Sequence, residues 1–520
     1  MKTALDIQAP EVTRLREPTM THSSFPVERS KGGLSLRPAS TPPAADTSII
    51  VVANRLPVRE EEGRWCLSPG GLVSALTPIV RNSSGIWLGW SGKINEEGGR
   101  VHVDELNLID IPMSERDYDE YYCEFSNQVL WPLFHDRIRQ PPFSERGWEG
   151  YLRVNKRFAQ ATAEIAPEKG CVWLQDYHLL LVPGLLKQMR PDLQIGLFLH
   201  IPIPPNELFA TIPWRDQLTG SLLKADLIGT QTPIDAMHMR AILCEHKHFH
   251  DDEIQRPLSV EIDAFPISID STKFLKAAKE SEATGRVSFL RQELANNRRI
   301  YLGVDRLDYT KGIDLRLLAF EQALEQGYLD PAQVCFVQVA VPSRGGVSDY
   351  QEISEKVDML VGRINGRFGG IRGPVVHYIK ESIDFAGLVD LYRSADVMVV
   401  TPVRDGMNLV AKEYIATRYD ATGELILSEF AGAAHELTQA TIVNPHDQRA
   451  LTKAMAEAYD RQGSGSHAHA MQTLHDQVLE FDVNRWAKEF TRRLEQATHD
   501  DHYECVKDDR SLDIDPKEES

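Results

Sequence analysis

The sequence predicts an α/β protein built from two doubly wound, Rossmann-like domains that face each other across a central cleft. Short apolar runs alternate with helical segments along most of the 520 residues, a pattern typical of parallel sheets covered on both faces. The runs fall into two series, and a chain of this length exceeds what one hydrophobic core usually serves. The series meet near residues 264–270, where we place the domain boundary.

Each expected strand is a nearly continuous apolar run. In the N-terminal domain, residues 48–268, the runs are 48–53, 170–175, 194–200 and 227–229. In the C-terminal domain, residues 269–498, they are 299–304, 334–340, 375–379, 397–400, 424–428 and 440–443. We expect the last helix to pack back on the N-terminal domain. We expect residues 1–47, rich in Pro, Ser and Thr, and the acidic residues 499–520 to be disordered.

Composition narrows the class of protein. The formal net charge of -19 argues against a nucleic-acid or anionic-membrane surface. The start of the chain lacks the apolar core of a signal peptide. The sequence contains no run of about 18 apolar residues, so we expect no membrane span. Six widely spaced cysteines without a CxxC motif are typical of reduced thiols in a cytoplasmic protein. We therefore expect a cytoplasmic location, with no nucleic-acid or membrane partner.

The segment from Arg404 to Glu413 is the most informative motif. It follows the apolar run 397–400, passes through a polar turn containing Gly406, and then becomes helical. Backbone N–H groups at such a turn and helix start favour a phosphorylated ligand, and Glu413 is placed to accept hydrogen bonds from sugar hydroxyls. The alternative is an ordinary strand-to-helix connection with a solvated acid.

Two cations follow the first strand of the second series. Arg306 and Lys311 are spaced to aim at one anion, since arginine binds phosphate bidentately and lysine supplies a point charge. Arg344, after the next strand, could hold a second phosphate. The alternative for the pair is a role in surface ion pairs.

The first series carries its own candidate groups. Gly70 and Gly71 precede a helix and would let backbone N–H groups approach a ligand, although a tight turn is the better explanation of the pair taken alone. They form neither a P-loop nor a GxGxxG fingerprint. Asp176 and His200 follow two strands and suit a polyhydroxylated ligand, although His200 could be a satisfied strand-end histidine. The paired carboxylates of a glycosidase cannot be recognised.

Residues 245–252 contain three alternating histidines and two acids that resemble a metal tract. Nothing nearby completes such a site, so we expect a solvated loop there and predict no metal site.

Taken in order, these motifs resemble those of the trehalose-6-phosphate synthase family, retaining glycosyltransferases of family 20 with the GT-B fold. The resemblance runs from about Ile49 to Glu495. The segments that carry it are Ala53–Pro57, Ser68–Leu72, Tyr121–Asn127, Leu130–Pro132, Asp176–His178, His200–Pro202, Arg306–Gly312, Arg363–Gly366 and Asp405–Glu413.

The resemblance implies transfer of glucose from a nucleotide sugar, usually UDP-glucose, to glucose 6-phosphate, which gives trehalose 6-phosphate. It implies no cofactor and no metal and a separate downstream phosphatase, and it allows a homo-oligomer. The residues implied at the transfer point are Asp176, His200, Arg306, Lys311 and Asp405. Those implied to bind the acceptor are Arg55, Tyr122, Trp131, Asp176 and Arg344. Those implied to bind the donor are Gly70, Gly71, Arg306, Lys311, Ile383, Asp405, Gly406, Met407, Asn408, Leu409, Val410 and Glu413.

In this family the leaving phosphate is thought to help take the acceptor proton, so that catalysis is mainly positioning and charge stabilisation. Ile203 stands where an aromatic is usual and Thr230 where phenylalanine is common. The sequence leaves open UDP-, ADP- or GDP-glucose as donor, and a sister enzyme using glycerol 3-phosphate or a pseudo-sugar phosphate. A non-catalytic sugar-phosphate sensor is a further alternative, whereas the missing fingerprint disfavours an NAD oxidoreductase.

Overall fold

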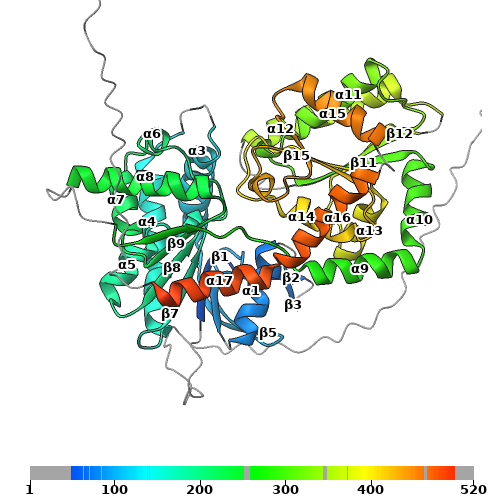
Figure 1. Cartoon of the computed structure of the whole chain (residues 1–520). Coiled ribbons are helices and arrows are strands. Elements are labelled where there is room, and N and C mark those ends of the chain that lie inside the picture. The colour runs from blue at the N-terminus through cyan, green and yellow to red at the C-terminus, as the bar shows by residue number, and fades with distance from the viewer. Residues whose placement is uncertain are drawn as a thin grey trace, which may run out of the picture.

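The computed structural model describes residues 49–61, 64–68, 71–83, 85–137, 139, 141–250, 258–342, 348–371, 373–461 and 465–497. Two α/β units, each built on one large sheet, make up the molecule (Figure 1). This confirms the predicted architecture of two doubly wound units. The two predicted tails, together with Gly70 and Arg344, lie outside the described residues.

The first sheet has the order β10-β9-β8-β7-β1-β4-β6-β5. Its strands pair in parallel except at the edge, where β5 is antiparallel to β6. Strands β4 to β6 were not predicted: β5 and β6 mix polar and apolar residues, whereas β4, with the sequence IWLGW, is as apolar as the predicted strands. The strands are β1 (Ile49–Arg55), β4 (Ile86–Trp90), β5 (Gly99–Val103), β6 (Leu106–Asp110), β7 (Cys171–Gln175), β8 (Gln194–Phe198), β9 (Leu227–Thr230) and β10 (Glu261–Ala264).

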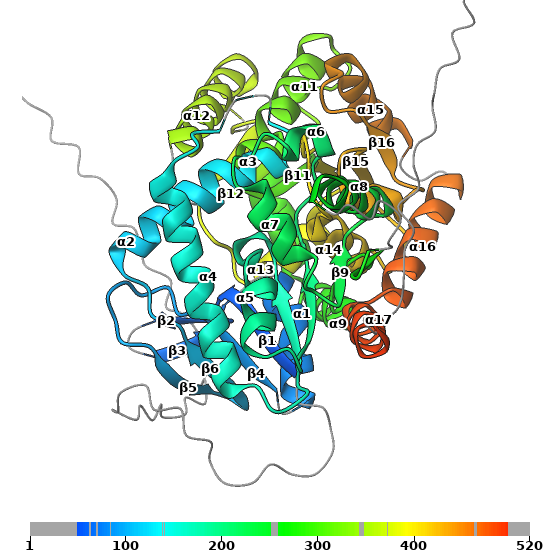
Figure 2. The same cartoon turned by 90° about the vertical axis from the view of Figure 1, so that its left-hand side faces the viewer.

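Helices cover both faces of this sheet, as alternating side chains on β1 show. Val51 packs in the cluster that contains α1 and α17, whereas Ile50 and Val52 pack in the cluster that contains α4, α5 and α7. Figure 2 shows α4, α5 and α7 on the near side of the unit. The helices are α1 (Gly71–Asn82), α2 (Glu115–Asp117), η1 (Tyr118–Leu130, a π-helix), α3 (Trp131–Phe134), α4 (Glu145–Ile165), η2 (Tyr177–Leu179), α5 (Val182–Met189), α6 (Asn206–Phe209), α7 (Arg215–Leu222) and α8 (Pro233–His250); β2 (Val58–Glu61) and β3 (Arg64–Leu67) form a separate hairpin.

The second sheet has the order β13-β12-β11-β14-β15-β16, and all its strand pairs are parallel. Its strands are β11 (Arg299–Arg306), β12 (Val334–Val341), β13 (Val376–Ile379), β14 (Val397–Val400), β15 (Glu424–Ser428) and β16 (Thr441–Val443). Its helices are α9 (Ser271–Ala283), α10 (Arg286–Leu290), η3 (Arg291–Ala295), η4 (Tyr309–Lys311), α11 (Ile313–Glu325), α12 (Ser348–Phe368), α13 (Phe385–Ser394), α14 (Leu409–Thr417), η5 (Gly432–His435), α15 (Gln448–Arg461) and α16 (Gly465–Glu480).

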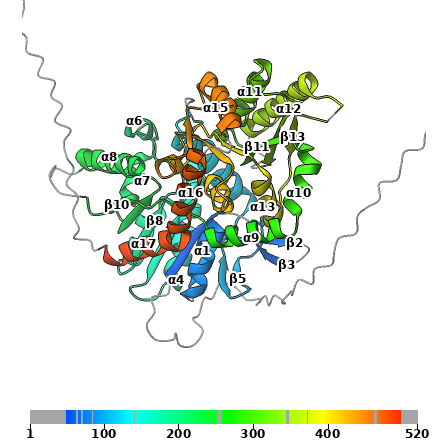
Figure 3. The same ribbon diagram turned by 45° about the vertical axis from the view of Figure 1, so that its right-hand side comes forward.

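The last helix, α17 (Val483–Gln496), returns from the second unit to the first sheet (Figure 3). The ring of Phe490 stacks on Trp173 of β7, with centroids 4.6 Å apart and planes 12° apart. A Cβ on Gly196 of β8 would lie 2.8 Å from Leu494, and one on Gly229 of β9 would lie 2.7 Å from Phe490. The two strand glycines therefore make room for the helix.

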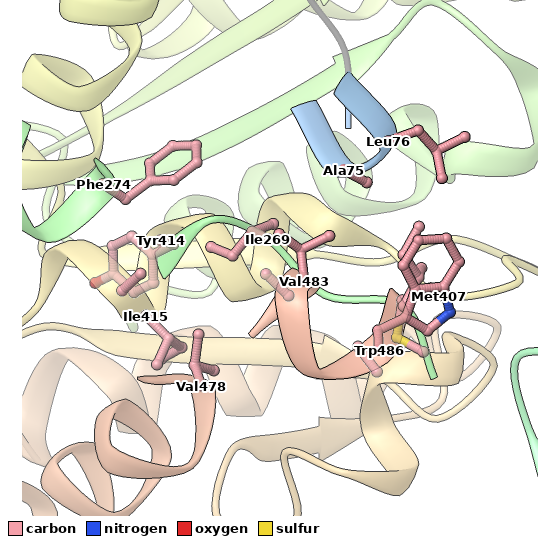
Figure 4. Packing of buried hydrophobic residues seen from close by; sticks show 14 of the residues in the cluster. Ala75, Leu76, Ile269, Phe274, Met407, Tyr414, Ile415, Val478, Val483 and Trp486 are labelled. Carbon is pink, nitrogen blue, oxygen red and sulfur yellow. The ribbon is translucent and has the colours of Figure 1, made fainter. Parts of the chain in front are cut away.

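A continuous apolar cluster joins the two units where the chain crosses between them. It includes Leu76 of α1, Ile269 of the linker, Met407 before α14, and Trp486 of α17 (Figure 4). We call this group the hinge core. Its polar neighbour is the buried Lys412, whose ammonium donates to the carbonyl oxygen of Ile267 at 2.8 Å and pairs with Glu436. The linker is thus fixed by both packing and hydrogen bonding.

One expectation from the sequence was wrong. The histidine tract is not a loop up to residue 250, because α8 continues through His250; residues 251–257 lie outside the described part. Cys66, Cys123, Cys171 and Cys335 are free thiols. Across the described residues, no group of three or more His, Cys, Asp or Glu side chains could hold a metal ion, and no helix is long and apolar enough to span a membrane.

Candidate functional site

The turn between β14 and α14 has a fixed shape. Asn408 caps α14 from a left-handed conformation, with φ of 77°, and its side chain accepts from the backbone N–H of Ala411 at 3.2 Å. Backbone hydrogen bonds tie the turn to the segment after β15, from Asp405 N to Phe430 O at 3.1 Å and from Ala433 N to Met407 O at 2.8 Å. The predicted strand, turn and helix are present, and the turn is anchored at both ends.

A buried ion pair joins this turn to the loop after β11. The Lys311 ammonium donates to Asp405 Oδ2 at 2.5 Å, and Asn408 donates to the same oxygen at 3.1 Å. Burial is the largest influence and opposes ionisation of Asp405, but the charge and hydrogen bond of Lys311, together with His135 and the Asn408 hydrogen bond, hold the pKa of Asp405 below its usual range. The two candidates named from separate motifs therefore form one unit.

Sequence reasoning missed the residue that supports this pair. Arg316 of α11 is fully buried and donates to the carbonyl oxygen of Lys311 at 2.6 Å, to Asp305 at 2.6 Å and to Thr401 at 3.0 Å. It thereby links β11, the Lys311 loop and the segment after β14. An arginine between apolar neighbours in a buried helix was the available signal, since buried charges are normally paired.

Asp176 and His200 lie side by side because β7 and β8 are neighbouring parallel strands. The His200 backbone N–H donates to Asp176 Oδ1 at 3.1 Å, and His200 Nε2 lies 2.9 Å from Gln175 Oε1. Burial lowers the pKa of His200 to about 3, so the ring is neutral near pH 7. Asp176 has φ of 72°, a strained conformation for a side chain of this kind.

The candidate acceptor residues line an aromatic wall in the first unit. The Arg55 guanidinium at the end of β1 lies 4.6 Å from the Trp90 ring centroid. The Tyr122 ring packs edge-on to Trp90 and is stacked on His178, with centroids 5.9 Å apart. Trp131, at the start of α3, continues the wall, and its backbone carbonyl lies 2.7 Å from Nδ1 of the buried His135. Sequence reasoning did not single out Trp90 or His135.

The remaining candidates in the second unit lie around α14 and α13. Glu413 accepts from the Tyr392 hydroxyl at 2.7 Å, and burial raises the pKa of its carboxyl. Ile383 is partly buried in the loop before α13 and packs against the apolar cluster that contains the hinge core. Leu409 and Val410 are the first two residues of α14, so their backbone N–H groups lack helical partners. Gly71 begins α1.

The two units approach closely at these strand ends. The Arg306 guanidinium at the end of β11 lies 5.8 Å from the Trp131 ring centroid. A Cβ on Gly406 would lie 2.0 Å from the carbonyl oxygen of His200, which no side chain could tolerate. The Lys311–Asp405 turn and the His200 loop therefore belong to one site. Ile203 and Thr230, which depart from the common pattern, are both fully buried in the first unit.

The chain forms two doubly wound units, and cations, carboxylates and aromatic rings lie where their strand ends face each other. These features define an enzyme of the GT-B class. Residues 47–496 match the model of glycosyltransferase family 20, and the chain belongs to that family.

The chain is similar to known proteins over nearly their whole length. The chain is 44% identical over 493 residues to the trehalose-6-phosphate synthase of Mycolicibacterium gilvum, covering 90% of this chain and 97% of the relative. A UDP-forming α,α-trehalose-phosphate synthase of Burkholderia xenovorans, solved in complex with glucose 6-phosphate, is 32% identical with a TM-score of 0.78, over 86% of this chain and 100% of that one. An E. coli structure bound with UDP-2-fluoro glucose is 33% identical with a TM-score of 0.75, over 87% and 100%.

Proposed function

We propose that this protein transfers glucose from UDP-glucose to glucose 6-phosphate with retention of configuration, forming trehalose 6-phosphate and UDP. One observation carries the proposal: the buried Lys311–Asp405 pair faces the Asp176–His200 pair across the contact between Gly406 and His200. A cation for a diphosphate and several acceptors for sugar hydroxyls thus converge at one place. The similarity to trehalose-6-phosphate synthases supports both substrates.

The donor is proposed to lie on the second unit. Lys311 and Arg306 follow β11 and would bind the diphosphate, with Arg306 exposed toward Trp131. The turn from Asp405 to Asn408 would hold the transferred glucose, and the first N–H groups of α14 would add positive potential. Glu413 would accept from the ribose hydroxyls, with its carboxylate oriented by Tyr392. Ile383 would contact the nucleotide base.

The acceptor is proposed to lie on the first unit. Arg55 and Tyr122 share the Trp90 ring, so a phosphate held by them would be fixed by a rigid aromatic surface. Trp131 would cover the sugar, and Asp176 would accept from its hydroxyls. Arg344 and Gly70 are proposed to contribute to the phosphate and donor sites, respectively.

The residues favour a reaction without a covalent enzyme intermediate. Asp405 is ion-paired to Lys311 and Asp176 is bonded to the backbone of His200, so neither is poised as a nucleophile. The glucosyl C1–O bond to the diphosphate breaks as the bond to the acceptor hydroxyl oxygen forms. The acceptor proton passes to the leaving phosphate oxygen, whose negative charge Arg306 and Lys311 stabilise. Because these cations supply the charge, we propose that no metal is required.

The test is a donor-by-acceptor panel with purified protein, scored by release of nucleoside diphosphate and by isolation of the disaccharide phosphate. We expect release from UDP-glucose only when glucose 6-phosphate is present, and unchanged release in the presence of a chelator. Release with glycerol 3-phosphate instead would overturn the acceptor assignment, and ADP- or GDP-glucose as the better donor would overturn the nucleotide assignment. Absence of transfer with tight sugar-phosphate binding would indicate a sensor.

Arg306→Ala should lower turnover by about 100-fold or more, as expected for removal of one charge-stabilising group. Arg299→Ala is the matched control, because Arg299 begins the same strand and lies over Tyr459, away from the site. Equal activities of the two variants would contradict the role of Arg306. We propose that a separate phosphatase acts on the trehalose 6-phosphate that this protein would make.

A further inference from the structure

Three consecutive residues after α3 each face the second unit. His135 lies close enough to Lys311 and Asp405 for their charges to affect its titration. The carboxylate of Asp136 pairs with Arg404, and the guanidinium of Arg137 lies 4.3 Å from the Tyr309 ring centroid. In Figure 1, α3 is on the side of the first unit that faces the second. Residues 135–137 are therefore a concentrated point of contact between the units.

Two carboxylates of the first unit lie close to the Arg404 guanidinium. Its Nε lies 3.1 Å from Asp136 Oδ2, and one terminal nitrogen lies 3.8 Å from Asp235 Oδ1. Asp235 is itself held by the Ile203 N–H at 2.8 Å and by the hydroxyl of Thr232. Asp136 adopts a left-handed conformation, with φ of 52°, which non-glycine residues rarely do. Strain of this kind persists only where the surrounding contacts determine it.

Arg404 connects this contact between the units to the proposed donor turn. Arg404 immediately precedes Asp405, and the next residue, Gly406, meets the His200 backbone. The hinge core, which includes Met407 of the same turn, joins the units through apolar packing. The units are therefore connected by a hydrophobic hinge, which salt weakens little, and by a partly buried ion pair, with side chains 22% and 38% exposed, which salt screens only in part. An ion pair of this exposure shifts an equilibrium by only up to about fivefold, which suits a contact that must open and close.

We propose that Asp136 and Arg404 form an ionic clasp that closes the two units on each other and makes Arg404 a positioning residue for the 405–408 turn. The clasp does not touch substrate. It sets the distance between the donor turn and the acceptor wall, so its loss lowers the rate of transfer more than the affinity for either substrate. The effect on rate rests on the proposed transferase function, whereas the closure itself does not.

The experiment uses the full-length chain with Asp136→Asn, Arg404→Gln and the double variant. We expect each single variant to lower kcat by about 3- to 5-fold with KM values within about twofold, a split that follows from misplacement rather than lost binding. The double variant should be no slower than the worse single one, because both remove the same contact. Arg404→Lys should recover part of kcat, since it keeps the charge.

The matched control is Arg190→Gln with Asp192→Asn, an ion pair at 2.8 Å that lies within the first unit. It should leave kcat and the domain spacing unchanged. Unaltered kcat in Arg404→Gln, or losses in the two single variants that multiply in the double variant, would overturn the clasp.

Small-angle X-ray scattering without substrates tests closure independently of activity. The wild type should expand between 50 and 500 mM salt, roughly from a Debye length of 14 to 4 Å, whereas Arg404→Gln should be expanded already at low salt. Identical, salt-independent scattering curves would overturn the clasp even if the enzyme is active. If the wild type shows no transfer at all, the scattering result still decides the clasp, and only the proposed function fails.

Discussion

Gly406→Ala is the most direct test of how closely the two units must approach. An added Cβ would lie 2.0 Å from the His200 carbonyl oxygen and 3.1 Å from the Cα of Ile201. An ordinary carbon–oxygen contact is about 3.3 Å, so more than about 1 Å of separation must open. Both obstacles are backbone atoms and cannot rotate aside. A displacement of about 1 Å costs roughly 100-fold in rate, so we expect kcat/KM to fall by about that factor.

The clash is with the other unit, so the second unit itself should fold normally. We expect Tm to change by only a few degrees, about what a change of 1 kcal/mol produces in a chain of this size. Binding of UDP, measured by calorimetry, should stay within about threefold, because the proposed nucleotide contacts lie within one unit. Glycosyl transfer is measured by UDP release at several concentrations of both substrates.

Gly362→Ala is the matched control. Gly362 lies inside α12, and a Cβ there meets nothing within 4 Å. The control should therefore keep full activity and gain up to about 1 kcal/mol of stability from helix propensity. Gly406→Ala with wild-type kcat/KM would refute the reasoning, since it would mean that the productive spacing is wider than the one described. Loss of UDP binding in parallel with activity would equally refute it, by placing the defect in the second unit.

Three further predictions concern the site. Lys311→Met leaves Asp405 buried without its partner, so we expect a loss of about 3–5 kcal/mol in urea unfolding and at least about 100-fold in turnover; an unchanged unfolding midpoint would contradict the pairing. Glu413→Gln should raise KM for the nucleotide sugar by about 10-fold or more with little change in kcat, as expected for a charged hydrogen bond; a fall in kcat alone would argue against a ribose contact. Burial lowers the pKa of His135 to about 4, so the unfolded chain takes up a proton below pH 6.5 that the folded chain does not. The wild type should lose up to about 3 kcal/mol of stability between pH 6.5 and 4, and His135→Gln should flatten that slope in denaturant titrations; parallel slopes would show that His135 does not contribute.

Local sequence patterns predicted much of the fold. The apolar run at 397–400 and the polar turn after it predicted β14 and the start of α14, because a buried parallel strand needs a continuous apolar segment. Strand ends likewise pointed to Lys311 and Asp405, which the structure joins at 2.5 Å. These features depend on residues close in sequence or on the shared edge of one sheet. At the other edge of the first sheet, β5 and β6 escaped prediction because they mix polar and apolar residues, whereas β4 is apolar and its omission has no such explanation.

The contacts between the units could not have been predicted in the same way. Arg404 and Asp136 are far apart in the chain, and nothing in either local pattern indicates that they pair. Gly406 was expected to bind the donor as part of its turn, whereas nothing in the local pattern indicated the constraint from the His200 carbonyl in the other unit. The histidine tract was wrongly assigned to a loop because it is polar and charged, whereas its residues 245–250 continue the helix α8.

The Lys311–Asp405 pair shows how the site can keep a cation ready before a ligand arrives. Lys311 is almost fully buried, and an unpaired ammonium there would be costly to keep out of water. Asp405 offsets that cost, and Arg316 fixes the backbone carbonyl of Lys311 so that the side chain starts from one position. A diphosphate arriving beside the pair would compete with a carboxylate already held by Asn408. Little rearrangement is then needed when charge develops on the leaving oxygen, which is the condition under which fixed charges accelerate a reaction most.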